Sequence, residues 1–152
     1  MILTKKAFFI FLCFSLFLPL SAETQNSPDW TILWGTDTGL YRQDRRGTVA
    51  ILWSGARVKS ILQMGSGWAI LTDEGIWVSE NLRNWEQRSK GLPEKVIKIY
   101  EGRAKSFVST VQEIKDFAID PANPELMVCA VKDAVYLSRD GGLKWESLGM
   151  PS

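Results

Sequence analysis

The chain has 152 residues, of which 18 are Lys or Arg, 17 are Asp or Glu and none is His. This balance of charge argues against a nucleic-acid-binding protein, which would carry a basic surplus. With no histidine and only two cysteines, the sequence has neither a ligand set for zinc nor a His-dependent catalytic triad. We therefore expect no metal and no cofactor.

The first 22 residues have the order of a secretory signal peptide. Two lysines precede an apolar run, residues 7–20, which ends at the small residues Ser21 and Ala22. We predict cleavage after Ala22. The alternative is an uncleaved anchor, because Leu20 is a large residue at the third position before the cut. That run of about fourteen residues is shorter than the roughly twenty that span a bilayer, so a membrane is a partner only if cleavage fails.

Removal of residues 1–22 leaves 23–152, a normal size for one domain. The exported chain would reside in the periplasm, the cell envelope or the extracellular space. It keeps one cysteine, Cys129, so that no internal disulfide can form. Because its neighbours in the sequence are apolar, Cys129 is expected to be a buried small residue.

The mature sequence is typical of an all-β protein. Short segments rich in β-branched and aromatic residues alternate with Gly, Asp, Asn and Pro. No stretch keeps a helical apolar period for three turns, although residues 106–115 leave open one short helix or an ordered loop. The expected strands are 30–34, 49–53, 58–64, 68–72, 75–79, 96–100, 117–119, 126–131 and 134–138.

Part of this sequence is repeated. Residues 72–93, TDEGIWVSENLRNWEQRSKGLP, align with residues 131–151, VKDAVYLSRDGGLKWESLGMP, and place Trp85 against Trp145 with one residue of slack. A weaker copy, TDTGLYR, occupies residues 36–42. Many short strands are typical of a sandwich, a barrel or a propeller, and the internal repeat favours the propeller.

One turn of the last copy carries a specific motif. Ser138, Asp140, Gly142 and Trp145 have the spacing Ser-x-Asp-x-Gly-x-x-Trp. In a hairpin turn, the carboxylate accepts hydrogen bonds from backbone N–H groups, glycine supplies a positive φ, and tryptophan packs beneath the turn. These four residues are therefore predicted to have a structural role.

The middle copy contains a degenerate form of the same motif. Ser79 and Trp85 are kept and Asn81 stands at the Asp position, but the glycine is missing and the segment is one residue shorter. We predict an equivalent, imperfect turn.

On these motifs the chain resembles the Asp-box (BNR-like) β-propeller proteins, a group that includes sialidases, xyloglucan-active glycosidases, the sortilin ectodomain and a photosystem II assembly factor. The strand, Asp-Pro turn and strand of residues 117–126 also resemble these repeats. The resemblance covers about residues 30–151. It implies an all-β, partial β-propeller of about three antiparallel four-stranded blades within residues 23–152. It also places the Asp-box on the outer rim, away from a central ligand channel.

The predicted ring is incomplete. The equivalent aromatic residues Tyr41, Trp77 and Tyr136 are 36 and 59 residues apart. The chain therefore holds about three blades, whereas roughly four to eight close a propeller. An open stack exposes strand edges. We expect a truncated reading frame, favoured because the chain stops at Pro151 and Ser152 where a blade would begin, or self-association into a ring, or completion by another chain.

These features predict an exported, non-enzymatic binding or assembly module whose partner is another protein chain or a second copy. The alternative is a sialidase-like or glucan-active glycosidase, or its remnant, which needs two carboxylates facing across a cleft. The acids before the repeated strands, Asp37, Asp73 and Asp133, are expected to be turn residues. Trp30 and Trp34 lie outside the best-aligned copies, and they are candidate binding residues for a protein or a carbohydrate.

Overall fold

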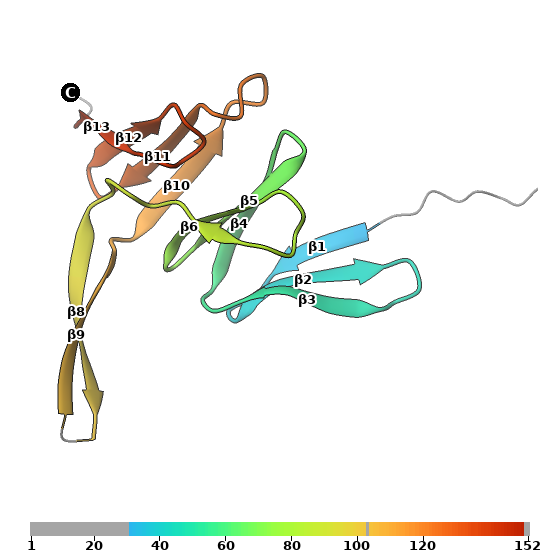
Figure 1. The fold of residues 1–152 in the computed structure, drawn as a ribbon, viewed down its shortest axis with the longest axis horizontal. Coiled ribbons are helices and arrows are strands. Elements are labelled where there is room, and N and C mark those ends of the chain that lie inside the picture. Colours follow the sequence, from blue (N-terminus) through green and yellow to red (C-terminus); the bar gives the residue numbers. More distant parts are fainter. Residues whose placement is uncertain (1–30, 103, 151–152) are drawn as a thin grey trace, which may run out of the picture.

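The computed structural model describes residues 31–102 and 104–150. This part of the chain is all-β, as predicted: it contains thirteen strands and no helix, and every pair of neighbouring strands is antiparallel. The strands form four separate sheets, none of which closes into a barrel (Figure 1). The expected signal peptide and Trp30 lie outside the described residues. Within the described ranges, no helix is long and apolar enough to cross a membrane.

Each sheet follows the order of the chain, so that every connection is a hairpin. The first meander consists of β1 (Thr31–Gly35), β2 (Gly39–Asp44) and β3 (Val49–Ser54). The second meander consists of β4 (Val58–Met64), β5 (Gly67–Thr72), β6 (Gly75–Ser79) and β7 (Glu86–Gln87). A two-stranded hairpin follows, made of β8 (Glu94–Glu101) and β9 (Ala104–Val111). The third meander consists of β10 (Ile114–Ile119), β11 (Met127–Val131), β12 (Ala134–Ser138) and β13 (Glu146–Gly149).

Two of the three meanders have the expected four strands, whereas the first has three in the described residues. The prediction of a short helix or an ordered loop at residues 106–115 is wrong. Most of this segment forms β9, where β-branched Val108 and Thr110 pair with β8 at Ile97 and Lys95. The β8–β9 hairpin lies between the second and third copies of the repeat, and it accounts for the longer second spacing.

The second meander is buried on both faces because it lies between the other two. Residues 69–72 of β5 are at most 3% exposed, although alternate side chains of a strand point to opposite faces. One face joins the first interface, formed by the buried residues Leu40, Trp53, Val58 and Ile70, with Trp77 and Trp85 packed against them. The other face joins the second interface, formed by Ala69, Leu71, Ile76, Val78, Leu92, Val111, Ile114, Phe117, Met127, Cys129, Val131 and Trp145.

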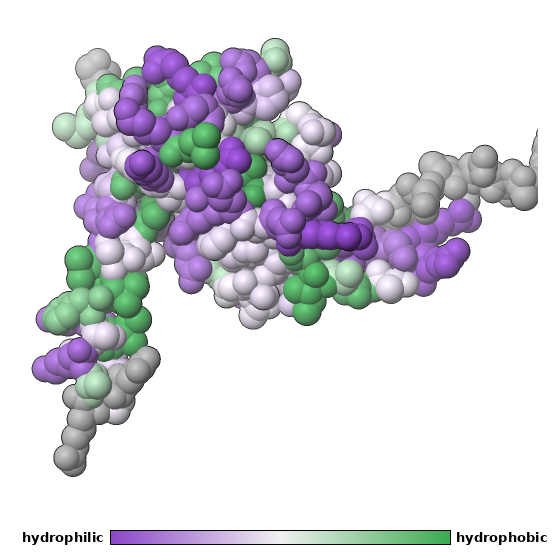
Figure 2. Space-filling view, viewed as in Figure 1, coloured by the Kyte–Doolittle hydropathy of each residue, from purple (hydrophilic) through white to green (hydrophobic). Residues whose placement is uncertain are grey.

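The β8–β9 hairpin extends away from the three meanders, as Figure 1 shows, and apolar residues cover much of it in Figure 2. Its base is closed by the backbone N–H of Gln112, which donates to the Pro93 carbonyl at 2.8 Å, and Leu92 and Val111 at this base pack in the second interface. The exposed large side chains of the hairpin are Val96, Ile97, Ile99, Tyr100, Phe107 and Val108. An isolated two-stranded hairpin is marginal in water, so this surface is suited to contact with another molecule.

Candidate functional site

The turn between β12 and β13 contains the complete Ser-x-Asp-x-Gly-x-x-Trp motif. The buried Ser138 hydroxyl donates to Asp140 Oδ1 at 2.8 Å and accepts the Gly142 amide at 2.8 Å. Asp140 Oδ1 also accepts the Lys144 amide at 2.9 Å. Gly142 has φ of 87°, and a Cβ there would lie 3.3 Å from Arg88 Cβ. Side-chain oxygens therefore close the turn, and the positive φ and the close contact with Arg88 favour glycine at position 142.

These contacts act on the ionisation of Asp140. The hydrogen bond from the Lys144 amide, followed by the bond from Ser138, holds the pKa of the Asp140 carboxyl below its ordinary value of 3.8. Both donors stabilise the carboxylate form. Asp140 is therefore charged at neutral pH, and its acceptor capacity is used in the turn.

The turn after β6 uses the same chemistry with different residues. The backbone N–H of Asn81 donates to Ser79 Oγ at 3.3 Å, and Asn81 Oδ1 accepts the backbone N–H groups of Arg83 and Asn84, both at 2.9 Å. Leu82 adopts φ of 60° without being glycine. An asparagine side chain thus takes the place of the carboxylate, and Leu82 adopts the left-handed conformation that Gly141, with φ of 68°, adopts in the other turn.

Both turns lead into a tryptophan whose indole reaches the preceding meander. Trp85 Nε1 donates to the Leu52 carbonyl of β3 at 3.0 Å. Trp145 Nε1 donates to the Arg88 carbonyl, directly after β7, also at 3.0 Å. We call this bond the indole tie. It joins the second meander to the first and the third to the second in the same way.

The second indole tie is reinforced by its surroundings. The Trp145 ring is 2% exposed and meets the ring of Phe117 edge to face, with 6.3 Å between centroids. The Trp145 amide donates to the Lys90 carbonyl at 2.9 Å, and Arg88 Nη1 donates to the Gly141 carbonyl at 2.8 Å. The motif of the last copy is thus occupied in holding two meanders together.

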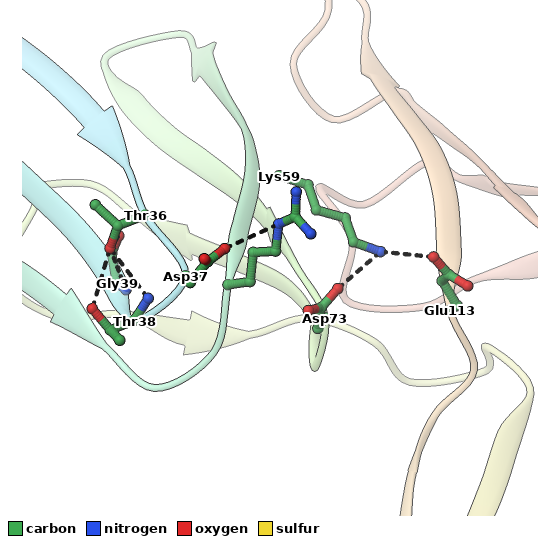
Figure 3. Close-up of polar contacts among 8 residues, drawn as sticks. Thr36, Asp37, Thr38, Gly39, Lys59, Asp73 and Glu113 are labelled. Atoms are coloured by element: carbon green, nitrogen blue, oxygen red, sulfur yellow. Dashed lines mark hydrogen bonds and ion pairs between the residues drawn. The ribbon is translucent and has the colours of Figure 1, made fainter.

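Two of the three acids that precede the repeated strands, Asp37 and Asp73, are paired with cations (Figure 3). Lys59 Nζ on β4 lies 3.0 Å from Asp73 Oδ1 and 3.2 Å from Glu113 Oε1. Burial alone would lower the pKa of Lys59, but these two carboxylates outweigh it and raise the pKa above its ordinary value of 10.5. Arg57 Nε is 3.4 Å from Asp37 Oδ1, and both side chains are largely exposed.

Lys59 connects parts of the chain that are far apart in sequence. Asp73 belongs to the β5–β6 turn, whereas Glu113 lies between β9 and β10. Two carboxylates that share one ammonium group at an exposed surface are not arranged as an acid and a base across a substrate. The cluster therefore fixes the start of the third meander beside the second.

Cys129 is buried in the second interface. Burial raises the pKa of the Cys129 thiol to about 12, so the thiolate nucleophile is absent at neutral pH. In residues 31–102 and 104–150, no group of three or more Cys, Asp or Glu side chains is placed to hold a metal ion.

Trp34 lies on a sheet face that is open to contact. Its ring stacks on Tyr41, with 5.9 Å between centroids and 17° between planes. Ile51 pairs with Tyr41 on the same face and is 66% exposed. The structure thus places Trp34 in an apolar, aromatic surface of the first meander. Tyr41 and Ile51 were not singled out from sequence as surface residues, because their common face depends on strand register.

We compared the chain with models of known protein families, with curated proteins and with solved structures, and none of them matches it. The site is therefore interpreted from its own geometry.

Replacing Trp85 by Phe removes the indole tie but keeps most of the aromatic surface. We expect the free energy of unfolding to fall by about 1–3 kcal/mol, because the Leu52 carbonyl loses its partner. Trp77→Phe is the matched control: Trp77 packs against the same interface, and its buried Nε1 has no hydrogen-bond partner. Urea titration measures both, and equal losses in the two variants would refute a role for the tie.

Asp140 should make stability depend on pH. Because its pKa is lowered on folding, the carboxylate stabilises the fold above about pH 3.8, and this contribution is lost as pH falls through the lowered value. The urea midpoint of Asp140→Asn should therefore lie below that of the natural chain at pH 6 and approach it in acid. Asp133→Asn is the control, because no hydrogen bond to a described residue holds that carboxylate. A gap for Asp140→Asn that stays constant to pH 2 would contradict this account.

Proposed function

We propose that the chain is an exported, non-enzymatic binding or assembly module of the Asp-box β-propeller type, in which the three meanders are successive blades. The observation that carries this proposal is the indole tie. Trp85 and Trp145 each follow a turn closed by a serine and an Asn or Asp side chain, and each binds a backbone carbonyl of the preceding meander at 3.0 Å.

The order and burial of the sheets support the same proposal. Successive meanders of up to four antiparallel strands pack face to face, as the blades of a propeller do. The second meander is covered on both faces by its neighbours in the chain. A module of this kind is completed by further blades, which another protein chain or a second copy can supply.

The surface favours binding over catalysis. Large apolar side chains are exposed on the β8–β9 hairpin and on the first and third meanders, and exposed apolar patches mark interaction sites. In contrast, Asp37, Asp73 and Glu113 are paired with Arg57 or Lys59. The location of such a module would be the periplasm, the cell envelope or the exterior, as directed by residues 1–22.

This proposal is tested with the full chain, expressed with its own leader and purified after export. We expect no hydrolysis of sialosides or β-glucans. The carboxylates that line a common hollow are Glu80 with Glu86 and Asp140 with Glu146. Of these, Glu86 is paired with Arg88, Glu146 is paired with Lys144, and Asp140 accepts the backbone N–H of Lys144 in its own turn. Asp73→Asn and Glu113→Gln are assayed alongside, since both carboxylates pair with the Lys59 ammonium group. Hydrolysis by the natural chain that either substitution abolishes would replace the binding module by a glycosidase. Retention of the full chain in the cytoplasm would contradict export.

A further inference from the structure

The third meander has one face packed on the second meander and one face turned outward. On β11 and β12 the outward residues alternate with those of the second interface. Two hollows, of about 140 and 310 Å³, lie on this surface and share Ala118 and Val128 in their linings. We call it the tail face, and its side chains are Ala118, Val128, Ala130, Val135 and Leu137.

Strand register shows that the tail face is equivalent to the surface of the second meander that lies in the second interface. The β5–β6 and β11–β12 hairpins both have two-residue loops, so their pairs can be counted from the loop. At the second and fourth pairs, the second meander places its side chains in the second interface. The equivalent pairs are Leu71–Ile76 and Ala69–Val78 in the second meander, and Ala130–Val135 and Val128–Leu137 in the third. The tail face therefore repeats the surface on which the third meander itself docks.

The outward face of the first meander is equivalent to the surfaces by which the second and third meanders pack on the meander before them. The third pair from the loop is Ile70–Trp77 in the second meander and Cys129–Tyr136 in the third, and both pairs pack toward the preceding meander. In the first meander the Thr36 backbone N–H donates to the Gly39 carbonyl at the loop, so that the third pair is Trp34–Tyr41. We call its outward surface the head face. Ile32 and Ile51 on this surface are 50% and 66% exposed.

We propose that two copies of this chain associate head to tail, with the head face of each copy seated on the tail face of the other. The inference rests on the proposed function, and it names the partner as a second copy. The head face and the tail face are equivalent to the two surfaces that pack together in each internal contact between meanders. Their residue pairs lie at the same positions counted from the hairpin loops. Three meanders from each copy would give a ring of about six blades, within the four to eight that close a propeller. A head-to-tail contact is self-limiting when its rotation closes a ring.

One position distinguishes this joint from the two internal ones. Val49 is the residue of the first meander that is equivalent to Trp85 and Trp145. The residue after each of them pairs with the preceding strand at an equivalent position: Ala50 with Arg42, Glu86 with Val78, and Glu146 with Leu137. The head face therefore brings no indole tie. In the two internal ties, the carbonyls of Leu52 and Arg88 accept the indole N–H. The equivalent residue of the third meander is Leu148. Association should accordingly be reversible and should depend on concentration.

The oligomeric state of the full chain, purified after export, tests this proposal by sedimentation velocity. The natural chain should be a dimer at micromolar concentration. Leu137→Asp on the tail face and Ile51→Asp on the head face should each give a monomer. A mixture of these two variants should recover a weaker heterodimer, because one intact head still meets one intact tail. Ile97→Asp, on the β8–β9 hairpin, is the matched control and should remain dimeric.

Each of the following results would contradict head-to-tail pairing. A dimer broken by Leu137→Asp but not by Ile51→Asp would show a tail-to-tail contact, and one broken only by Ile97→Asp would show a hairpin contact. A natural chain that stays monomeric would overturn the proposal. In that case normal indole ties and absent hydrolysis would leave the proposed function standing, so the two failures are separable.

Val49→Trp keeps the proposal testable if an aspartate variant fails to fold. The new indole restores the donor that the internal joints have, and circular dichroism checks that the sheets persist. We expect the dimer dissociation constant to fall on the order of tenfold, because one hydrogen bond is added at each of two joints. An unchanged or larger constant in a folded Val49→Trp variant would contradict head-to-tail pairing.

Discussion

A sheet with apolar side chains on both faces has to be covered twice, and the organisation of this chain follows from that constraint. Only the second meander meets it within the described residues, since β5 is buried from Ala69 to Thr72. The indole ties fix how each sheet sits on the one before it. A directional bond at 3.0 Å sets the position, and the surrounding apolar contacts supply the burial. The outward faces of the first and third meanders have no such cover in the described residues, and they expose Ile32, Ile51 and Val128.

The complete turn motif was predictable because its chemistry is local. Ser138, Asp140 and Gly142 contact residues within a few positions in the sequence, so spacing alone indicates which oxygen meets which amide. The degenerate turn at Ser79 was predictable for the same reason, since Asn81 offers an equivalent oxygen. The all-β class likewise followed from short segments of β-branched and aromatic residues between turns.

The features that depend on register or on backbone atoms were not predictable. The acceptor of each indole tie is a carbonyl, which every residue carries, so the sequence has no signal for it. Val49 was not recognised as the counterpart of Trp85 because a valine does not carry the motif, and only strand pairing places the following residue, Ala50, at the same step as Glu86. Residues 106–115 were misread because β9 is stabilised by pairing with β8 rather than by a buried face. The bridge from Lys59 to Glu113 joins positions 54 residues apart, and only the packed sheets bring them together.

The central claim is that the same indole tie joins each meander to the one before it. Hydrogen exchange of the tryptophan indole N–H groups, followed by NMR on the full chain with labelled tryptophan, measures this directly. Assignment of the resonances comes from single Trp→Phe variants. The account predicts that the indole protons of Trp85 and Trp145 exchange far more slowly than in the urea-unfolded chain, because both are held by carbonyl acceptors at 3.0 Å. Exchange of either proton at the rate of the unfolded chain would contradict it.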